Sequence, residues 1–509
     1  MQCLDRAGLA LDNALTLGDL LARLAGIHRD DRLIEERHEP HSLRLTYAQA
    51  ADQVERMAAV IAEAVSPGDR VVVATPNGYE QLLVSLAASR AGAVPVPVNP
   101  QMRPDEVDYV IADSGATLVV RQPEEVKGAE PITDAVVDAR RPRPGDVAAI
   151  FYTSGTTGRP KGAELTHRAL VGNLHALAIV PSGLRHDEVV AGLPVAHIMG
   201  FLVLLAAAAA GVPVYALPKF RADQVLDAIE RRRSTVFIGV PAMYRLLLEA
   251  GAEQRDLSSI RVWASGADVM PADLARRFQR MGAAYTLPVI GRSIGAAAFA
   301  EGYGMVETAG AVAFKLSPPG IALPVPVLGG ILGLPVPGNR LKVVRPDGRQ
   351  VGVGQVGELV VRGPGLLAGY HGDAAATADV LGADGWLHTG DLARRGLLGT
   401  VSFAGRAKDV IKSGGYSVYA VEVERAMEEH PDVAEAAAVG IPDARLGERT
   451  AVAVRVRDGA TVTEHELLGW GEAHLSDYKR PRVVRIVDEL PRTGTEKVAK
   501  QRLRPLFAA

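Results

Sequence analysis

A short run of hydroxyls, glycines and one lysine is the part of the sequence with the most specific chemistry. The stretch Tyr152–Gly162 reads Tyr-Thr-Ser-Gly-Thr-Thr-Gly-Arg-Pro-Lys-Gly. Glycines let backbone N–H groups turn inward, hydroxyls add donors and the ammonium adds a point charge, which together suit a polyphosphate. A Walker A loop is excluded, because its spacing needs glycine where Pro160 stands. The apolar run Val147–Tyr152 predicts a buried strand before the loop, and Leu165–Ala178 predicts a helix after it.

At these residues the chain resembles the adenylate-forming superfamily, which includes acyl-CoA synthetases, peptide-synthetase adenylation domains and luciferases. Further blocks that resemble the family follow in the family's order from about Thr46 to Lys500. The resemblance implies that Thr153 takes part in catalysis and that ATP is bound by the loop residues Thr153, Ser154, Gly155, Thr156, Thr157, Gly158 and Lys161.

The block Glu301–Thr308 resembles the Y-G-x-T-E block of the same family. The resemblance implies that Tyr303 lies beside the adenine and that Glu307 helps to hold Mg²⁺ on the triphosphate. Mg²⁺ prefers one or two carboxylates together with phosphate oxygens, which agrees with that role. Val306 stands where the family has threonine, so Thr308 and the loop threonines are candidates for the missing hydroxyl. Other ATP contacts implied here are Gly302, Gly304 and Thr308.

Two further blocks imply an acyl pocket. Ala264–Ala267 follows a predicted strand and resembles the segment that lines the adenine and the acyl group, with Gly266 and Ala267 assigned to ATP. Leu193–His197 resembles the P-x-x-H block, although a lone histidine near apolar residues is more often structural. The resemblance assigns the acyl pocket to His197, Val240, Ser265 and Gly304.

The remaining blocks lie near the C-terminus. Thr389-Gly390-Asp391 resembles the family's ribose-binding block, in which the carboxylate of Asp391 would accept hydrogen bonds from the ribose hydroxyls. Arg406 is implied as a ribose or phosphate contact, and Lys408 falls at the family's hinge position. Lys497 matches the family's catalytic lysine, where an ammonium offsets charge at the α-phosphate.

Two features of this region complete the comparison with the family. Glu496 stands where the family usually has glycine, directly before Lys497. Gly414 and Gly415 match the glycines that line the pantetheine tunnel of CoA ligases, which favours CoA as the acceptor.

The overall composition is typical of an ordinary soluble globular protein, and the length indicates more than one domain. The 509 residues exceed what one hydrophobic core usually serves, and the net charge of −3 gives no basic field for nucleic acid. The only cysteine, Cys3, excludes an internal disulfide, and a reducing cytoplasm fits. The first residues lack the pattern of a secretion signal. Val189–Pro218 has no charged side chain, but its prolines and glycines divide it into a loop, a helix and a strand, so we expect no membrane span.

Alternating strand and helix patterns predict an α/β fold. We expect a large N-terminal domain, residues 1–405, of parallel-rich sheets covered by helices with a β-rich subdomain. A hinge at 406–408 and a small mobile α+β domain at 409–509 should follow. Between Ser265 and Tyr303 the chain is about a dozen residues longer than expected, around Leu287–Gly295. Because this stretch and Pro318–Pro337 are apolar, we expect them to form a lid over the acyl chain.

The resemblance implies an acyl-CoA synthetase that uses ATP, Mg²⁺ and CoA. A carboxylic acid, for which fatty acids lead, would form an acyl-adenylate and then a thioester. The alternatives are transfer to a carrier protein or an amine, or ligation of malonate or an aromatic acid; Arg245 near Val240 is the cation that keeps malonate open. A homodimer also stays open.

Overall fold

The chain divides into two compact units, each of which is described by itself. One unit comprises Met1–Val325, Leu332–Arg340 and Arg362–Leu387, and the other takes the remaining segments, mainly Leu341–Val361 and His388–Ala509. The computed structural model describes residues 12–38, 42–99, 102–153, 160–172, 174, 187–286, 293–318, 332–413, 416–443, 445–492 and 498–507. The expected hinge at 406–408 concerns motion and stays a prediction.

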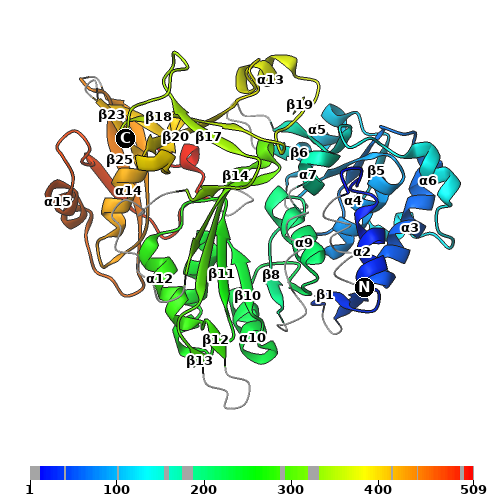
Figure 1. Ribbon diagram of the computed structural model, residues 1–509. Coiled ribbons are helices and arrows are strands. Elements are labelled where there is room, and N and C mark those ends of the chain that lie inside the picture. Colours follow the sequence, from blue (N-terminus) through cyan, green and yellow to red (C-terminus); the bar gives the residue numbers. More distant parts are fainter. Residues whose placement is uncertain are drawn as a thin grey trace. The chain divides into compact units, whose positions relative to one another are not determined.

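A nine-stranded sheet organises the first unit (Figure 1). Its order is β16-β15-β14-β11-β10-β8-β9-β1-β2, and the six strands from β14 to β1 run parallel. The α/β class expected from the sequence is therefore confirmed. The bounds are β1 (Arg32–Glu36), β2 (Leu43–Thr46), β8 (Val189–Ala191), β9 (Val214–Ala216), β10 (Val236–Gly239), β11 (Val262–Gly266), β14 (Ala298–Met305), β15 (Gly310–Ser317) and β16 (Leu334–Pro335).

Helices cover both faces of this sheet because its central strands are apolar on both sides. In β8, Val189 and Ala191 join a core that includes α9, whereas Val190 joins a second core with α10, α11 and α12. This alternation is the period-two pattern of a strand buried on two faces. The helices are α9 (Ile198–Ala210), α10 (Ala222–Arg232), α11 (Pro241–Glu249) and α12 (Ala272–Met281).

The stretch Val189–Pro218 folds as expected into a helix and core strands. The 13-residue α9 lies between β8 and β9, and Phe201 in its middle is fully buried. Strand β8 is an element that the sequence reading did not separate from the loop. Among the described residues, no helix is both long enough and apolar enough to cross a membrane.

The N-terminal part of the first unit adds two three-stranded sheets, β4-β3-β5 and β19-β7-β6. Helix α3 begins with a capping box, in which the Thr46 hydroxyl accepts from the N–H of Gln49. The elements are α2 (Leu20–His28), α3 (Tyr47–Ala64), β3 (Arg70–Val73), α4 (Tyr79–Arg90), β4 (Val94–Pro97), α5 (Pro104–Ser114), β5 (Leu118–Val120), η1 (Pro123–Val126), α6 (Asp134–Arg140), β6 (Val147–Thr153), β7 (Lys161–Thr166), α7 (His167–Gly172), β19 (Gly369–Tyr370) and α13 (Ala374–Val380).

The helix predicted over Leu165–Ala178 is wrong at its start. Lys161–Thr166 forms β7, an antiparallel partner of β6, because the alternate side chains Ala163 and Leu165 are buried. The Thr166 hydroxyl accepts from the N–H of Ala169, so α7 begins only at His167.

The segment expected to form a lid is described only at its flanks. Its flanks pair as a short antiparallel stem, β12 (Tyr285–Thr286) and β13 (Ser293–Ile294), directly before β14. This stem lies at the end of the large sheet where β14 begins (Figure 1), whereas Gly302 and Gly304 belong to the second half of β14. Residues 287–292, and 319–331 of the second apolar stretch, lie outside the described residues, so the expected lid stays a prediction.

The second unit contains two sheets. One has the order β17-β18-β20-β21, and the other joins β23-β22-β25-β24 with β26 paired to β25. Helices α14 and α15 pack on the second of these sheets around buried Val423, Leu467 and Val454. The elements are β17 (Arg340–Val344), β18 (Val356–Arg362), β20 (Leu387–Arg395), β21 (Val401–Arg406), η5 (Ala407–Asp409), β22 (Val410–Ser413), β23 (Tyr416–Tyr419), α14 (Ala420–Glu428), β24 (Val433–Asp443), β25 (Gly447–Val456), α15 (Glu464–His474) and β26 (Val483–Ile486).

Candidate functional site

The hydroxyl- and glycine-rich loop is held by an antiparallel strand pair. Thr153 at the end of β6 and Lys161 at the start of β7 are cross-strand partners, so both loop ends are fixed. Gly162 follows, and a Cβ there would lie 2.8 Å from the Ile150 side chain and 3.0 Å from the Tyr152 ring. The glycine is therefore needed for the close packing of the two strands. Ser154, Gly155, Thr156, Thr157 and Gly158 lie outside the described residues.

Two predicted site residues, Lys161 and Glu307, are brought together through a tyrosine. The Tyr370 hydroxyl donates to Glu307 Oε1 at 2.8 Å, and Lys161 Nζ lies 5.3 Å from the centre of the Tyr370 ring. Burial, with the charge of Glu307 and the hydrogen bond to it, raises the pKa of the Tyr370 phenol, so the hydroxyl stays protonated. A cation and a carboxylate therefore flank one side chain that sequence reasoning missed.

Glu307 lies in a single 3₁₀ turn, η3 (Val306–Thr308), directly after β14. Val306 and Thr308 are both buried, and the Thr308 hydroxyl accepts from the N–H of Met305 and donates to Gly310 O at 2.7 Å. The Thr308 hydroxyl is thus used in hydrogen bonds within the turn. The ATP contact that the family resemblance implies for Thr308 would therefore be made by its backbone. The side chain of Val306 belongs to the core, where a hydroxyl would need a partner.

The ends of β11 and β14 form a surface that lacks side chains. Gly266 and Gly302 are parallel partners, and a Cβ on Gly266 would lie 3.4 Å from Gly302 O. A Cβ on Gly304 would overlap the carbonyl of Gly310 in the neighbouring strand, so only glycine fits there. Ala267, the next residue after β11, has φ of 67°. A non-glycine residue in this region stores strain, as residues at functional sites often do.

Ser265 and Tyr303 face the other side of the two strands. The Ser265 hydroxyl is buried and has no hydrogen-bond partner in the described part of the chain. Val240, a further residue expected in the acyl pocket, is buried in the same core as Trp263 and Tyr244. Met199 and Val203 of α9 also pack against this core.

Two side chains of helix α9 face the glycine-rich strand ends, and sequence reasoning missed both. The Met199 methyl carbon would lie 3.4 Å from a Cβ on Gly266, and Leu202 Cδ1 would lie 2.6 Å from one on Gly310. These two side chains therefore face the glycine-rich strand ends. The expected residue His197 is the N-cap of the helix, where its Nδ1 accepts from the N–H of Met199 at 3.2 Å. Its structural role as the N-cap is thus visible, and Met199 and Leu202, three residues apart, lie on one face of the helix.

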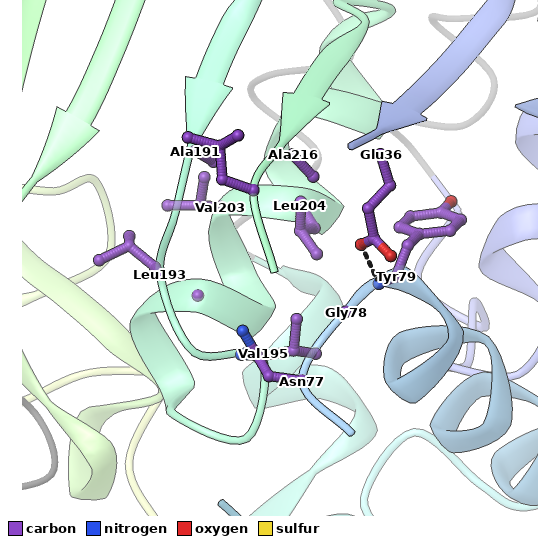
Figure 2. A pocket seen from close by; sticks show the side chains of 12 residues that line it. Glu36, Asn77, Gly78, Tyr79, Ala191, Leu193, Val195, Val203, Leu204 and Ala216 are labelled. Atoms are coloured by element: carbon purple, nitrogen blue, oxygen red, sulfur yellow. Dashed lines mark hydrogen bonds between the residues drawn. The ribbon is translucent and has the colours of Figure 1, made fainter. Parts of the chain in front are cut away.

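A small cavity lies beside the segment Leu193–His197, which precedes α9 (Figure 2). The hydrogen bonds around this cavity show how the segment is anchored. Asn77 accepts from the N–H of Val195 and donates to Pro218 O. Glu36 accepts from the N–H of Tyr79 at 2.6 Å, and burial raises the pKa of this carboxyl. The cavity of about 10 Å³ has room for roughly one water molecule, so it is too small for an acyl group.

The second unit contains the predicted ribose-binding group. Asp391 on β20 and Arg406 on β21 are cross-strand partners, and Arg406 Nε lies 3.1 Å from Asp391 Oδ1. Asp391 is only 2% exposed. Gly390 has φ of 68°, which lets the chain turn just before the carboxylate. Lys408 follows in the single turn η5.

The two other expected groups of this unit are flanked by described strands and bridges. Ser413 and Tyr416, on either side of Gly414 and Gly415, are antiparallel partners. Arg492 and Val498 form an antiparallel bridge on either side of Lys497. Gly414, Gly415 and Lys497 themselves lie outside the described residues.

The donor set fits magnesium held by substrate rather than a protein metal cage. In the parts of the chain that the structure describes, no three His, Cys, Asp or Glu side chains gather to hold a metal ion. A single carboxylate such as Glu307, together with phosphate oxygens, is a usual arrangement for Mg²⁺.

These features define an adenylate-forming fold, and the chain belongs to the family of AMP-binding enzymes. The model of the AMP-binding enzyme family matches residues 30–371, and that of the AMP-binding enzyme C-terminal domain matches residues 422–497. Both belong to the superfamily that the sequence blocks indicated.

Among similar proteins are two curated CoA ligases and one solved structure. The chain is 36% identical to a feruloyl-CoA synthase of Amycolatopsis sp, with 91% of this chain and 94% of the relative covered. It is 33% identical to an indoleacetate–CoA ligase of Aromatoleum aromaticum, with 91% and 93% covered. ATP-bound MatB from Rhodopseudomonas palustris is 29% identical with a TM-score of 0.80, over 97% of this chain and 99% of MatB.

Proposed function

We propose that the protein is an AMP-forming CoA ligase for an aromatic carboxylic acid. The observation that carries this proposal is the similarity to a feruloyl-CoA synthase and an indoleacetate–CoA ligase across 91% of the chain. Both relatives are named for an acid in which a ring is joined to a short carboxylate arm. This replaces the first preference for a fatty acid, which rested on how common fatty acids are as substrates in the family and on the apolar neighbourhood.

The pocket geometry supports a flat substrate. Gly266 and Gly302 offer backbone without side chains, and Met199 lies opposite Gly266. Met199 packs directly on Gly266 and is suited to contact an aromatic ring with its free side, because sulfur contacts to rings are favourable. The malonate alternative has Arg245, which stands half-buried on α11. We rank it second because, in the part of the chain that the structure describes, Arg245 lies on α11 and not at the glycine-rich strand ends.

In the first half-reaction the acid carboxylate attacks the α-phosphate and pyrophosphate leaves. Lys161 and the hydroxyl-rich loop would hold the polyphosphate, Glu307 would hold Mg²⁺, and Asp391 would accept from the ribose hydroxyls with Arg406 beside it. Bound Mg²⁺ supplies charge that offsets the triphosphate. Lys497 would neutralise the charge that grows at the α-phosphate. Positioning and charge neutralisation suffice, without a covalent enzyme nucleophile.

In the second half-reaction the CoA thiol attacks the acyl-adenylate and AMP leaves. We infer that rotation about Lys408 exchanges Lys497 for the Gly414-Gly415 loop, which would line a pantetheine path. Tyr416 beside this loop stacks on Tyr478 with ring centroids 4.6 Å apart, and Tyr416 is 57% exposed. Exposed aromatic rings are suited to stack on a base such as the adenine of CoA. This pair supports CoA over a carrier protein or an amine.

The test is a substrate panel with ATP, read as AMP formation and thioester product. Aromatic acids of the cinnamic and arylacetic type should give higher kcat/KM than straight-chain fatty acids or malonate. Met199→Ala should raise the KM for aromatic acids about tenfold and leave that for ATP unchanged, because a Met side chain contributes about 1.5–3 kcal/mol when buried. A preference for fatty acids or malonate would refute the proposal, and product with an amine or carrier protein but not CoA would refute the acceptor.

A further inference from the structure

The segment 367–371, here called the clamp segment, is attached to the turn that carries Glu307. The N–H of Leu367 donates to the backbone oxygen of Glu307 at 2.9 Å. The Tyr370 hydroxyl donates to Oε1 of the same residue at 2.8 Å. Both the backbone and the carboxylate of Glu307 are therefore bound by one segment that follows it by about sixty residues in sequence.

The clamp segment is also attached to β7, directly after Lys161. The N–H of Ala368 donates to Glu164 O at 2.8 Å, and that of His371 donates to Gly162 O at 2.7 Å. His371 Nδ1 lies 2.7 Å from Glu164 Oε1. Two strands and one turn, distant in sequence, are thus joined at the point where the polyphosphate loop ends.

We propose that Tyr370 is a positioning residue for ATP activation, which orients the carboxylate of Glu307 toward Mg²⁺ and supports the ammonium of Lys161. Its hydroxyl occupies Oε1, and among the described residues nothing donates to the other carboxylate oxygen. That second oxygen is the one left to bind the metal. The ring lies under Lys161 Nζ at 5.3 Å, which is within the range of a cation–π contact. This inference rests on the ATP-dependent step of the proposed function, and not on which acid is used.

A purely structural role for Tyr370 would not need its hydroxyl. The backbone is held separately, because the Tyr370 N–H donates to the Thr377 hydroxyl at 2.8 Å and β19 pairs with β7. The ring can pack without the oxygen. The phenol instead donates to a carboxylate implicated in metal binding, and such outer partners usually change metal affinity or activity 10–100-fold.

The test is Tyr370→Phe, which keeps the ring and removes only the hydroxyl. Pyrophosphate release is measured with any acid that the wild type activates, across a range of Mg²⁺ concentration at fixed ATP. We expect the Mg²⁺ concentration for half-maximal rate to rise about tenfold or more. The KM for the acid, and thioester formation from supplied acyl-adenylate, should stay unchanged, because neither depends on the metal-bound triphosphate.

Two controls separate positioning from loss of structure. Tyr109→Phe removes another phenol that donates to a carboxylate, Asp113 Oδ1 at 3.0 Å, and should leave the Mg²⁺ dependence as in the wild type. In a Glu307→Gln background, Tyr370→Phe should add no further loss, because the two residues act as one unit. Additive losses in the double variant, or an unchanged Mg²⁺ dependence in Tyr370→Phe, would overturn the proposal.

The proposed function fails in a different way. If the wild type releases pyrophosphate only with fatty acids or malonate, the proposed aromatic specificity is wrong. The Tyr370 proposal is then still tested, with those acids as substrates. If Glu307→Gln does not impair pyrophosphate release, the metal role of Glu307 and the positioning role of Tyr370 are both overturned.

Discussion

His167 gives the sharpest stability prediction, because a buried histidine accepts a backbone hydrogen bond next to the phosphate-loop strand. Its side chain is only 2% exposed, and its Nδ1 accepts from the N–H of Leu17 at 3.0 Å. Burial lowers the pKa of His167 to about 4, although Asp146 and Asp19 partly oppose this shift. The imidazole is therefore neutral in the folded chain at neutral pH, with its proton on Nε2.

The direction of the pH dependence follows from this shift. The folded pKa of about 4 lies below the ordinary value of 6.5, so the unfolded chain takes up the proton first as pH falls. The contribution of His167 to stability is full above about pH 6.5 and is lost as pH falls toward 4. At pH 5 the loss relative to pH 8 is about 2 kcal/mol, as an upper figure for this one group.

The perturbation is His167→Asn, whose side-chain oxygen can still accept from Leu17 but cannot titrate. Thermal unfolding of both proteins is followed from pH 8 to pH 5. The wild-type Tm should fall by roughly 2–4 °C more than that of the variant, because other groups change both proteins equally. His465→Asn, at an exposed histidine of α15, serves as a control for the loss of an imidazole that solvent already reaches. Parallel Tm curves for wild type and His167→Asn would refute the reasoning.

Two further predictions concern the chemical steps. Lys497→Ala should lose about 10²–10³-fold in adenylate formation, the size seen for one charge-stabilising donor, and should keep thioester formation from supplied acyl-adenylate. Equal losses in both half-reactions would contradict the assignment. Asp391→Asn should raise the KM for ATP about tenfold or more without changing that for the acid, because a hydrogen bond to a charged group contributes about 1.5–3 kcal/mol. Since Asp391 is buried against Arg406, the Tm of the Asp391→Asn variant is measured as well. An unchanged KM for ATP would show that Asp391 does not bind the ribose.

Most elements were predictable because their sequences are strongly patterned. The strand expected over Val147–Tyr152 is Val147–Thr153 in the structure, and the helix expected within Val189–Pro218 is Ile198–Ala210. Apolar runs bounded by glycine or proline leave little choice there. Strand β7 was missed because Gly162 and Thr166 weaken its pattern, while its pairing with β6 comes from tertiary contact.

The site was predictable only as far as its groups carry recognisable chemistry. Lys161 and Glu307 could be named from their blocks, but Tyr370, which touches both, could not. It is separated from Glu307 by 63 positions, and nothing local to Tyr370 indicates a carboxylate partner. Met199 and Leu202 were missed for a related reason. Their types are ordinary for an apolar helix, and only the glycines facing them give these side chains a role.

The expected lid stays a prediction, and strand order weighs against it. Apolar loops are usually buried, yet Tyr285 and Ile294 in the stem are 52% and 49% exposed. Strand direction is the stronger argument. In a parallel sheet, ligands bind at the carboxyl ends of the strands, and a segment that leads from a helix into a strand lies at the opposite edge. The insertion comes after α12 and before β14, whereas Glu307 comes after β14. Its position in the chain therefore places its flanks at the opposite edge from Glu307, whatever its hydrophobicity.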